Sequence, residues 1–251
     1  MSTDHFRGFD GSPSDQAPDI LATGHGGITT LFLSMAERHP DGKDADYLRW
    51  HSLDHRPEQH RLAGTRASLR VVSTPECRAA RAASSEAFDA VDHVMTYFFS
   101  DVADLEDFGT LSVALRDAGR APFILPPVQR GVYSVENRQA AARAKAGADV
   151  LPWVPARGVY LLLEEGPASS AGIEDIEGIT GVWSAASIPT GFSSAGAGQR
   201  LSYCFLNGDP VKTAQRLKPL LEKRWQQADI RPLFAAPFHT VAPYEWDRYL
   251  P

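Results

Sequence analysis

The feature that most constrains the fold is an order of strands and helices that occurs twice along the chain. In the first half, runs of β-branched and aromatic residues predict strands at 28–35, 69–73, 92–100 and 128–134. Apolar residues at three- and four-residue spacing predict helices at 44–60 and 101–120. The order is strand, helix, strand, strand, helix, strand, which is the ferredoxin-like pattern.

The second half repeats this order with one weak position. Strands are predicted at 157–163, 181–188, 200–206 and 232–239. A helix is predicted at 209–227, where Asp209 can cap the first turn and Pro210 suits the first helical position. Only a short helix or turn fits at 173–179, where the first helix of the unit would stand. The halves therefore share their element order and little residue identity.

A ferredoxin-like unit is an antiparallel sheet with helices on one face, so its other face needs a cover. Two tandem units can cover each other by packing sheet against sheet. The sequence thus predicts an α+β protein whose halves form one α/β barrel of the dimeric type. The expected organisation is a mobile N-terminal arm at 1–24, a first unit at 25–136, a linker at 137–150 and a second unit at 151–251.

Composition excludes several classes of partner. The chain has 25 Lys and Arg against 31 Asp and Glu, a net charge of −6 that argues against nucleic acid. No apolar run approaches the roughly 20 residues that span a bilayer, and no signal peptide is evident at the start. Two cysteines, Cys77 and Cys204, cannot form a disulfide framework, which is typical of a reducing cytoplasm. We therefore expect a cytoplasmic protein with no nucleic-acid or membrane partner.

One stretch of the first half stands out as a motif. Trp50 is followed by Asp54-His55-Arg56-Pro57-Glu58 and then by Leu62-Ala63-Gly64. The stretch resembles the EthD-like branch of the dimeric α/β-barrel superfamily, which carries an aromatic residue, Asp/Glu-His-x-Pro-Glu and Leu-Pro-Gly. Ala63 stands where that branch has proline. The resemblance covers roughly residues 27–135 and implies a ligand pocket between sheet and helices, without fixing the reaction.

Histidines supply the candidate acid/base groups. His51 and His55 are four residues apart and would share one face of the predicted helix. Imidazole takes or gives a proton near neutral pH. We predict that His55 is the general base or acid, with His51 or His93 as its partner. The structural alternative for His55 is a surface position, and for His51 it is a packing or surface role. For His93 it is a hydrogen-bonded place in the core.

The strand at 92–100 supplies the expected walls of the pocket. Alternation places His93, Met95, Tyr97 and Phe99 on one face, which lines the barrel if that face is the interior. Tyr97 could then donate a hydrogen bond to a ligand oxygen. The residues expected to bind the substrate are Trp50, Phe99, Met95, Phe32 and Asp54.

These residues favour a cofactor-free lyase, isomerase or cyclase that acts on an apolar or aromatic oxygenated compound, without a metal. One alternative is a non-catalytic binding protein for a hydrophobic metabolite. Another is a haem- or metal-dependent oxidoreductase on the same barrel. In that case His51 and His55, with His93 or His60, would hold a metal. Haem would need an axial ligand, for which His239 is the candidate in the second half. A homodimer is compatible with each function.

Overall fold

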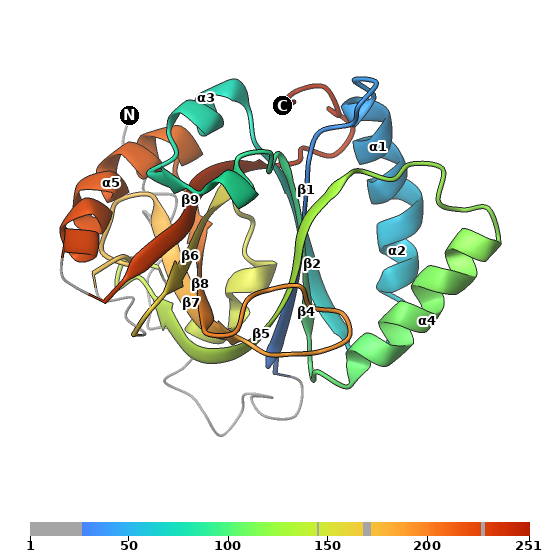
Figure 1. Ribbon diagram of the computed structural model, residues 1–251, viewed down its shortest axis with the longest axis horizontal. Coiled ribbons are helices and arrows are strands. Elements are labelled where there is room, and N and C mark those ends of the chain that lie inside the picture. Colours follow the sequence, from blue (N-terminus) through green and yellow to red (C-terminus); the bar gives the residue numbers. More distant parts are fainter. Residues whose placement is uncertain (1–26, 145, 168–171, 227–228) are drawn as a thin grey trace.

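The computed structural model describes residues 27–144, 146–167, 172–226 and 229–251 (Figure 1). The predicted arm at 1–24 lies outside the described residues. The strands of the first unit are β1 (Thr30–Ala36), β2 (Thr65–Val72), β4 (His93–Phe99) and β5 (Pro127–Ala140). Its helices are α1 (Asp44–Trp50), the π-helix η3 (His51–His55), α2 (Arg56–Gln59) and α4 (Asp104–Asp117).

The second unit contains four strands and one long helix. These elements are β6 (Gly158–Glu165), β7 (Ile179–Ser187), β8 (Gln199–Leu206), α5 (Pro210–Gln226) and β9 (Arg231–Thr240). The described residues just before β7 form turns, as the weak helical signal at 173–179 predicts. The two predicted runs of elements are therefore present in the expected order.

The strands form one closed barrel. Their order is β2-β4-β1-β5-β7-β8-β6-β9, and β2 also pairs with β9. Within each unit the order is that of a ferredoxin-like sheet, and the neighbouring strands pair antiparallel. The units join at β5–β7, where Tyr133 lies opposite Ser187, and at β2–β9, where Val72 lies opposite His239. The α+β barrel predicted from the element order is confirmed.

Side chains from both units fill the barrel interior. Phe98 of β4 contacts the rings of Trp183, Tyr203 and Phe205 from β7 and β8, with centroids 5.7–6.2 Å apart. Leu31 and Leu33 of β1 belong to the same buried cluster. The interior is thus a packed core shared by both halves.

The face of β4 that carries His93, Met95, Tyr97 and Phe99 is the outer face, which the alternation in the sequence had left open. Met95, Tyr97 and Phe99 pack with Phe108 of α4 in a separate cluster. Figure 1 shows α1, α2 and α4 together on this side of the first sheet, with α5 on the far side of the barrel. The ligand pocket must therefore be sought under these helices.

Two segments depart from the predicted organisation. Residues 137–140, the start of the predicted linker, extend β5 because Asn137 to Ala140 pair with β7. The rest of that linker includes the short 3-10 helix η5 (Ala148–Trp153). The segment that connects β2 to β4 forms three short elements that were not predicted, α3 (Pro75–Ala79), β3 (Ala83–Ser84) and η4 (Glu86–Phe88). Its strand pairs with β9, so part of the first unit covers the second.

The predicted helix at 44–60 is continuous, but its middle turn is a π-helix. The backbone N–H of Arg56 bonds to the carbonyl of His51, five residues earlier. Pro57 has no N–H for an α-helical bond and crowds the preceding turn, and the wider π turn accommodates it. Among the described residues no helix is long and apolar enough to cross a membrane.

Candidate active site

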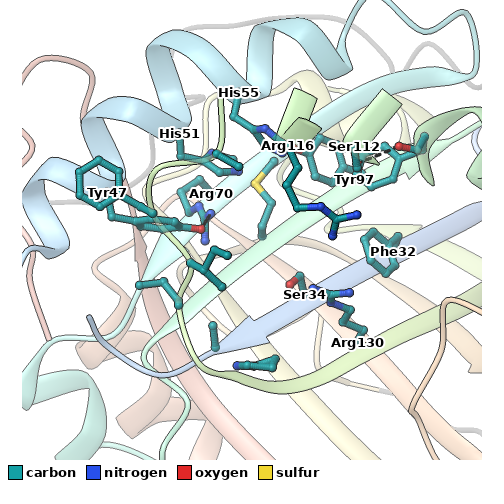
Figure 2. Close-up of a pocket in the computed structure, with 18 of the residues that line it drawn as sticks. Phe32, Ser34, Tyr47, His51, His55, Arg70, Tyr97, Ser112, Arg116 and Arg130 are labelled. Atoms are coloured by element: carbon teal, nitrogen blue, oxygen red, sulfur yellow. Dashed lines mark hydrogen bonds between the residues drawn. The ribbon is translucent and has the colours of Figure 1, made fainter. Parts of the chain in front are cut away.

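A half-open cavity of about 390 Å³ lies between the outer face of the first sheet and the helices α1, η3 and α4. Its size falls in the range of small-molecule sites. Seven aromatic side chains line it, namely Phe32, Tyr47, Trp50, Tyr97, Phe108, Phe123 and Phe192. Of these, Phe192 comes from the loop between β7 and β8, so the second unit closes part of the mouth. Figure 2 shows the polar side chains that reach the space.

Both predicted helix histidines line this cavity. The rings of His51 and His55 lie 5.5 Å apart between centroids, and Trp50 packs on His55 at 5.2 Å. Each histidine has a buried Nδ1 atom without a hydrogen-bond partner among the described residues. A buried polar atom without a partner costs free energy, so both rings are held in place at a cost to stability. The π-helix that carries both rings is a distortion found often at functional sites.

Arg70 of β2 places a positive charge at the same end of the cavity. The residue is 3% exposed, and its guanidinium donates a hydrogen bond to the Tyr47 hydroxyl and lies over that ring. Its Nε has no partner, and no carboxylate forms an ion pair with it among the described residues. Figure 2 shows Arg70 beside His51 and Tyr47. A buried cation without a counter-charge favours an anionic ligand.

Burial and this charge keep both histidines neutral. Burial lowers the pKa of His51 well below its usual value, and the positive charge of Arg70 lowers it further. Burial and Arg70 likewise lower the pKa of His55. Each imidazole can therefore accept a proton at neutral pH, and Arg70 can stabilise the negative charge left on the donor.

Tyr97 also reaches the cavity, with a buried hydroxyl that has no partner among the described residues. Burial raises the pKa of Tyr97 far above its usual value, so the hydroxyl stays protonated and can donate a hydrogen bond. Trp50, Met95 and Phe32 line the same space. The cavity thus gathers six of the residues predicted for the site, from β1, β4 and the helix.

His93 lies elsewhere, in a buried pair with Asp44. Its Nε2 lies 2.8 Å from Asp44 Oδ1, and its ring stacks edge-on against Tyr47. Burial lowers the pKa of His93, although Asp44 opposes that shift. His93 is not among the cavity-lining residues, so the geometry supports its structural alternative, a hydrogen-bonded core residue that positions Tyr47.

Phe99 and Asp54 also lie outside the cavity. Phe99 is fully buried behind it and packs edge-on against Phe108. Asp54 is turned to the surface, where its Oδ1 accepts a hydrogen bond from Arg120 at 3.0 Å. Arg120 also bonds to Glu58, so both carboxylates of the motif tie this helix to the end of α4. In a helix widened at 51–55, Asp54 cannot share the face of its histidine neighbours.

Several lining residues were not predicted, namely Ser34, Tyr47, Arg70, Phe108, Ser112, Arg116, Phe123, Arg130 and Phe192. Strand pairing could have pointed to Arg70. It lies opposite Met95, and Ser68 lies opposite Tyr97, so Arg70 stands on the same sheet face as the predicted site residues. The approach of Phe192 from the second unit has no local sequence signal, because it depends on the closed barrel.

The described residues do not bring together the metal ligands of the third sequence hypothesis, and its candidate haem ligand lies apart from the cavity. No group of three or more His, Cys, Asp or Glu side chains that could hold a metal ion occurs in the described part of the chain. His239, the candidate axial ligand, is outside the cavity and stacks on Tyr249 with centroids 4.0 Å apart.

Comparison with known proteins supports the fold. No family model matches the chain, and no curated protein matches its sequence. Among solved structures the chain is similar to an anthrone oxidase-like protein, with 11% identity, a TM-score of 0.50 and coverage of 86% of this chain and 92% of that one. It is also similar to a dye-decolorizing protein from V. cholerae, with 12% identity, a TM-score of 0.46 and coverage of 85% and 94%. At this level of identity, the likeness to the anthrone oxidase-like protein supports the α+β barrel fold alone.

Proposed function

We propose that the protein is an oxidoreductase that oxidises a planar phenolic or enolisable aromatic compound with dioxygen. The observation that carries the proposal is the buried, carboxylate-free Arg70 beside two neutral histidines in an aromatic cavity. Such a site favours the anionic form of a weakly acidic substrate. The anthrone oxidase-like neighbour supports oxidation as the outcome.

His51 is the proposed base. Its neutral imidazole takes a proton from the substrate, and the electron pair stays on the substrate as an oxyanion held by Arg70. Tyr97 donates a hydrogen bond to a second oxygen. The electron-rich anion reduces dioxygen. For a substrate with a ring methylene, one dioxygen converts CH₂ to C=O and leaves one water, which balances atoms and electrons.

The motif that resembles the EthD-like branch supports the same location. Trp50 and His55 both belong to that motif and line the cavity. The lyase, isomerase or cyclase predicted from the sequence would begin with the same proton abstraction, but it would need no dioxygen. The similarity to oxidoreductase-type structures gives no support to those three reactions.

Oxygen uptake with 1,8-dihydroxyanthrone as substrate tests the proposal, with the rate of uncatalysed oxidation subtracted. We expect His51→Gln to lower kcat about 100-fold or more, because general-base catalysis contributes factors of that order. His60→Gln is the matched control, since His60 is an exposed histidine of the same helical segment whose Nε2 contacts Ser68 outside the cavity. Circular dichroism confirms that both variants fold.

Three results would contradict the proposal. Conversion without oxygen uptake indicates a lyase, isomerase or cyclase, and tight binding of this and related aromatics without turnover indicates a binding protein. An unchanged rate in His51→Gln removes His51 as the base, and His55→Gln then tests the second cavity histidine.

A further inference from the structure

Two more arginines reach the cavity at the end away from His51. Arg116 extends from α4 and Arg130 from β5, so they approach from opposite walls. Figure 2 shows the Arg116 guanidinium turned into the cavity and Arg130 beside Ser34 of β1. The two side chains and the Ser34 hydroxyl therefore offer several hydrogen-bond donors to one region of the mouth.

Neither arginine has a partner that explains its position. Arg116 comes no closer than 4.0 Å to Asp117, and both side chains are more than 60% exposed, so this contact contributes almost nothing. The Arg130 guanidinium has no hydrogen bond or ion pair among the described residues; only its backbone bonds, to Ser194. No Asp or Glu is among the lining residues. The cationic charge of the mouth is therefore unbalanced.

The cavity thus has two separate cationic ends joined by aromatic walls. Arg70 marks the buried end, and Arg116 and Arg130 mark the mouth. Between them Phe108 packs edge-on against Phe32 at 5.6 Å and against Tyr97 at 4.8 Å. A flat ring system in this space would present one edge to each end.

We propose that the substrate is an aromatic acid whose carboxylate binds between Arg116 and Arg130, with its ionisable oxygen at Arg70. The inference rests on the proposed function only for the placement of that ionisable oxygen. A carboxylate suits this mouth because the planar guanidinium fork matches its two oxygens. The chain as a whole carries a net charge of −6, which repels an acid. The local positive charge of the mouth must therefore attract the carboxylate.

Calorimetric binding of anthraquinone-2-carboxylate and anthraquinone-2-carboxamide to the full chain tests this proposal. The two probes share one ring system and differ in charge, and neither can be oxidised by the proposed reaction. We expect the acid to bind about tenfold or more tightly than the amide, as charged hydrogen bonds allow. In the double variant Arg116→Gln/Arg130→Gln this preference should disappear, because the affinity for the acid falls more than the affinity for the amide.

Arg49→Gln is the matched control, because it removes one positive charge from an exposed residue of α1 that does not line the cavity. It should keep the preference for the acid. Arg116 and Arg130 are exposed, so their substitution should leave the fold intact. Equal binding of acid and amide by the wild-type protein would overturn the inference, as would an undiminished preference in the double variant.

The outcome is independent of the test of function, which uses a neutral anthrone. Oxygen uptake without a preference for the acid overturns only the carboxylate site. A preference that depends on Arg116 and Arg130, without oxygen uptake, overturns only the oxidation.

Discussion

Arg70 shows how a single residue can serve the site at a cost to the fold. Removing a guanidinium from water is unfavourable unless a counter-charge replaces the lost hydration. Within the described part of the chain, the guanidinium bonds only to the neutral Tyr47 hydroxyl, and the residue is 3% exposed. A ligand oxyanion would supply the missing charge. Because such a ligand would bind only the folded chain, it should also raise the free energy of unfolding.

The neutral histidines make stability depend on pH. The folded-state pKa values of His51, His55 and His93 lie below the usual value of 6.5, chiefly through burial. Between the folded and unfolded pKa values the unfolded chain binds more protons, so the free energy of unfolding rises with pH in that range. The contribution of these histidines is complete above pH 6.5. The Asp44 carboxyl, whose pKa is below 3.8, acts only in stronger acid.

We therefore expect the free energy of unfolding to fall as pH drops from about 7.5 to about 5. Each histidine held neutral contributes a slope of up to about 1.4 kcal/mol per pH unit. Urea unfolding at a series of pH values measures this slope, and His51→Gln should make it shallower. A free energy that stays constant over the same range would show that these histidines are not held neutral.

At the scale of elements, the mouth of the cavity is narrowed where Phe192 of the β7–β8 loop packs against Gly109 of α4. A Cβ added at Gly109 of α4 would lie 2.6 Å from the Phe192 ring. Hydrogen bonds hold the loop to β5, since Ser194 N–H donates to the Arg130 carbonyl at 2.7 Å and Ser193 Oγ accepts from Val132 N–H. The absence of a side chain at Gly109 therefore leaves room for the Phe192 ring at the mouth.

Gly109→Ala should displace the Phe192 ring and open the mouth. We expect anthraquinone-2-carboxamide to dissociate several-fold faster, as measured by stopped-flow fluorescence. The helix itself should gain roughly 1 kcal/mol, because alanine replaces glycine in its interior. Phe192→Ala should give the same acceleration, and the double variant should add nothing to it. Additive effects, or an unchanged dissociation rate, would show that this contact does not close the cavity.

The element order was predictable because strand and helix periodicities are local properties of the sequence. Which face of β4 lies in the barrel interior was not predictable. Every residue of β4 is buried, so its alternation carries no contrast between polar and apolar faces. The π turn at 51–55 also escaped prediction, although Pro57 marked the place where an α-helix is strained. These two features decide where the histidines point.

The molecule as a whole builds one site from two unequal units. The barrel core is shared, as the packing of Phe98 against Trp183 shows, and the segment that connects β2 to β4 covers the second unit. The first unit supplies the histidines and arginines, and the second supplies Phe192 at the mouth. From the described residues, the cavity joins three arginines and no carboxylate in a chain of net charge −6.

This contrast in charge predicts that the cavity lowers the pKa of a bound phenol. The ionisation of 4-nitrophenol, followed by its absorption at saturating protein, measures that pKa directly. We expect a decrease of about one unit or more relative to free solution, because an opposite charge at close range shifts a pKa by that amount. Arg70→Met should abolish the decrease, and Arg70→Lys should retain part of it. A bound phenol whose pKa is unchanged or raised would contradict the account that this cavity stabilises an oxyanion.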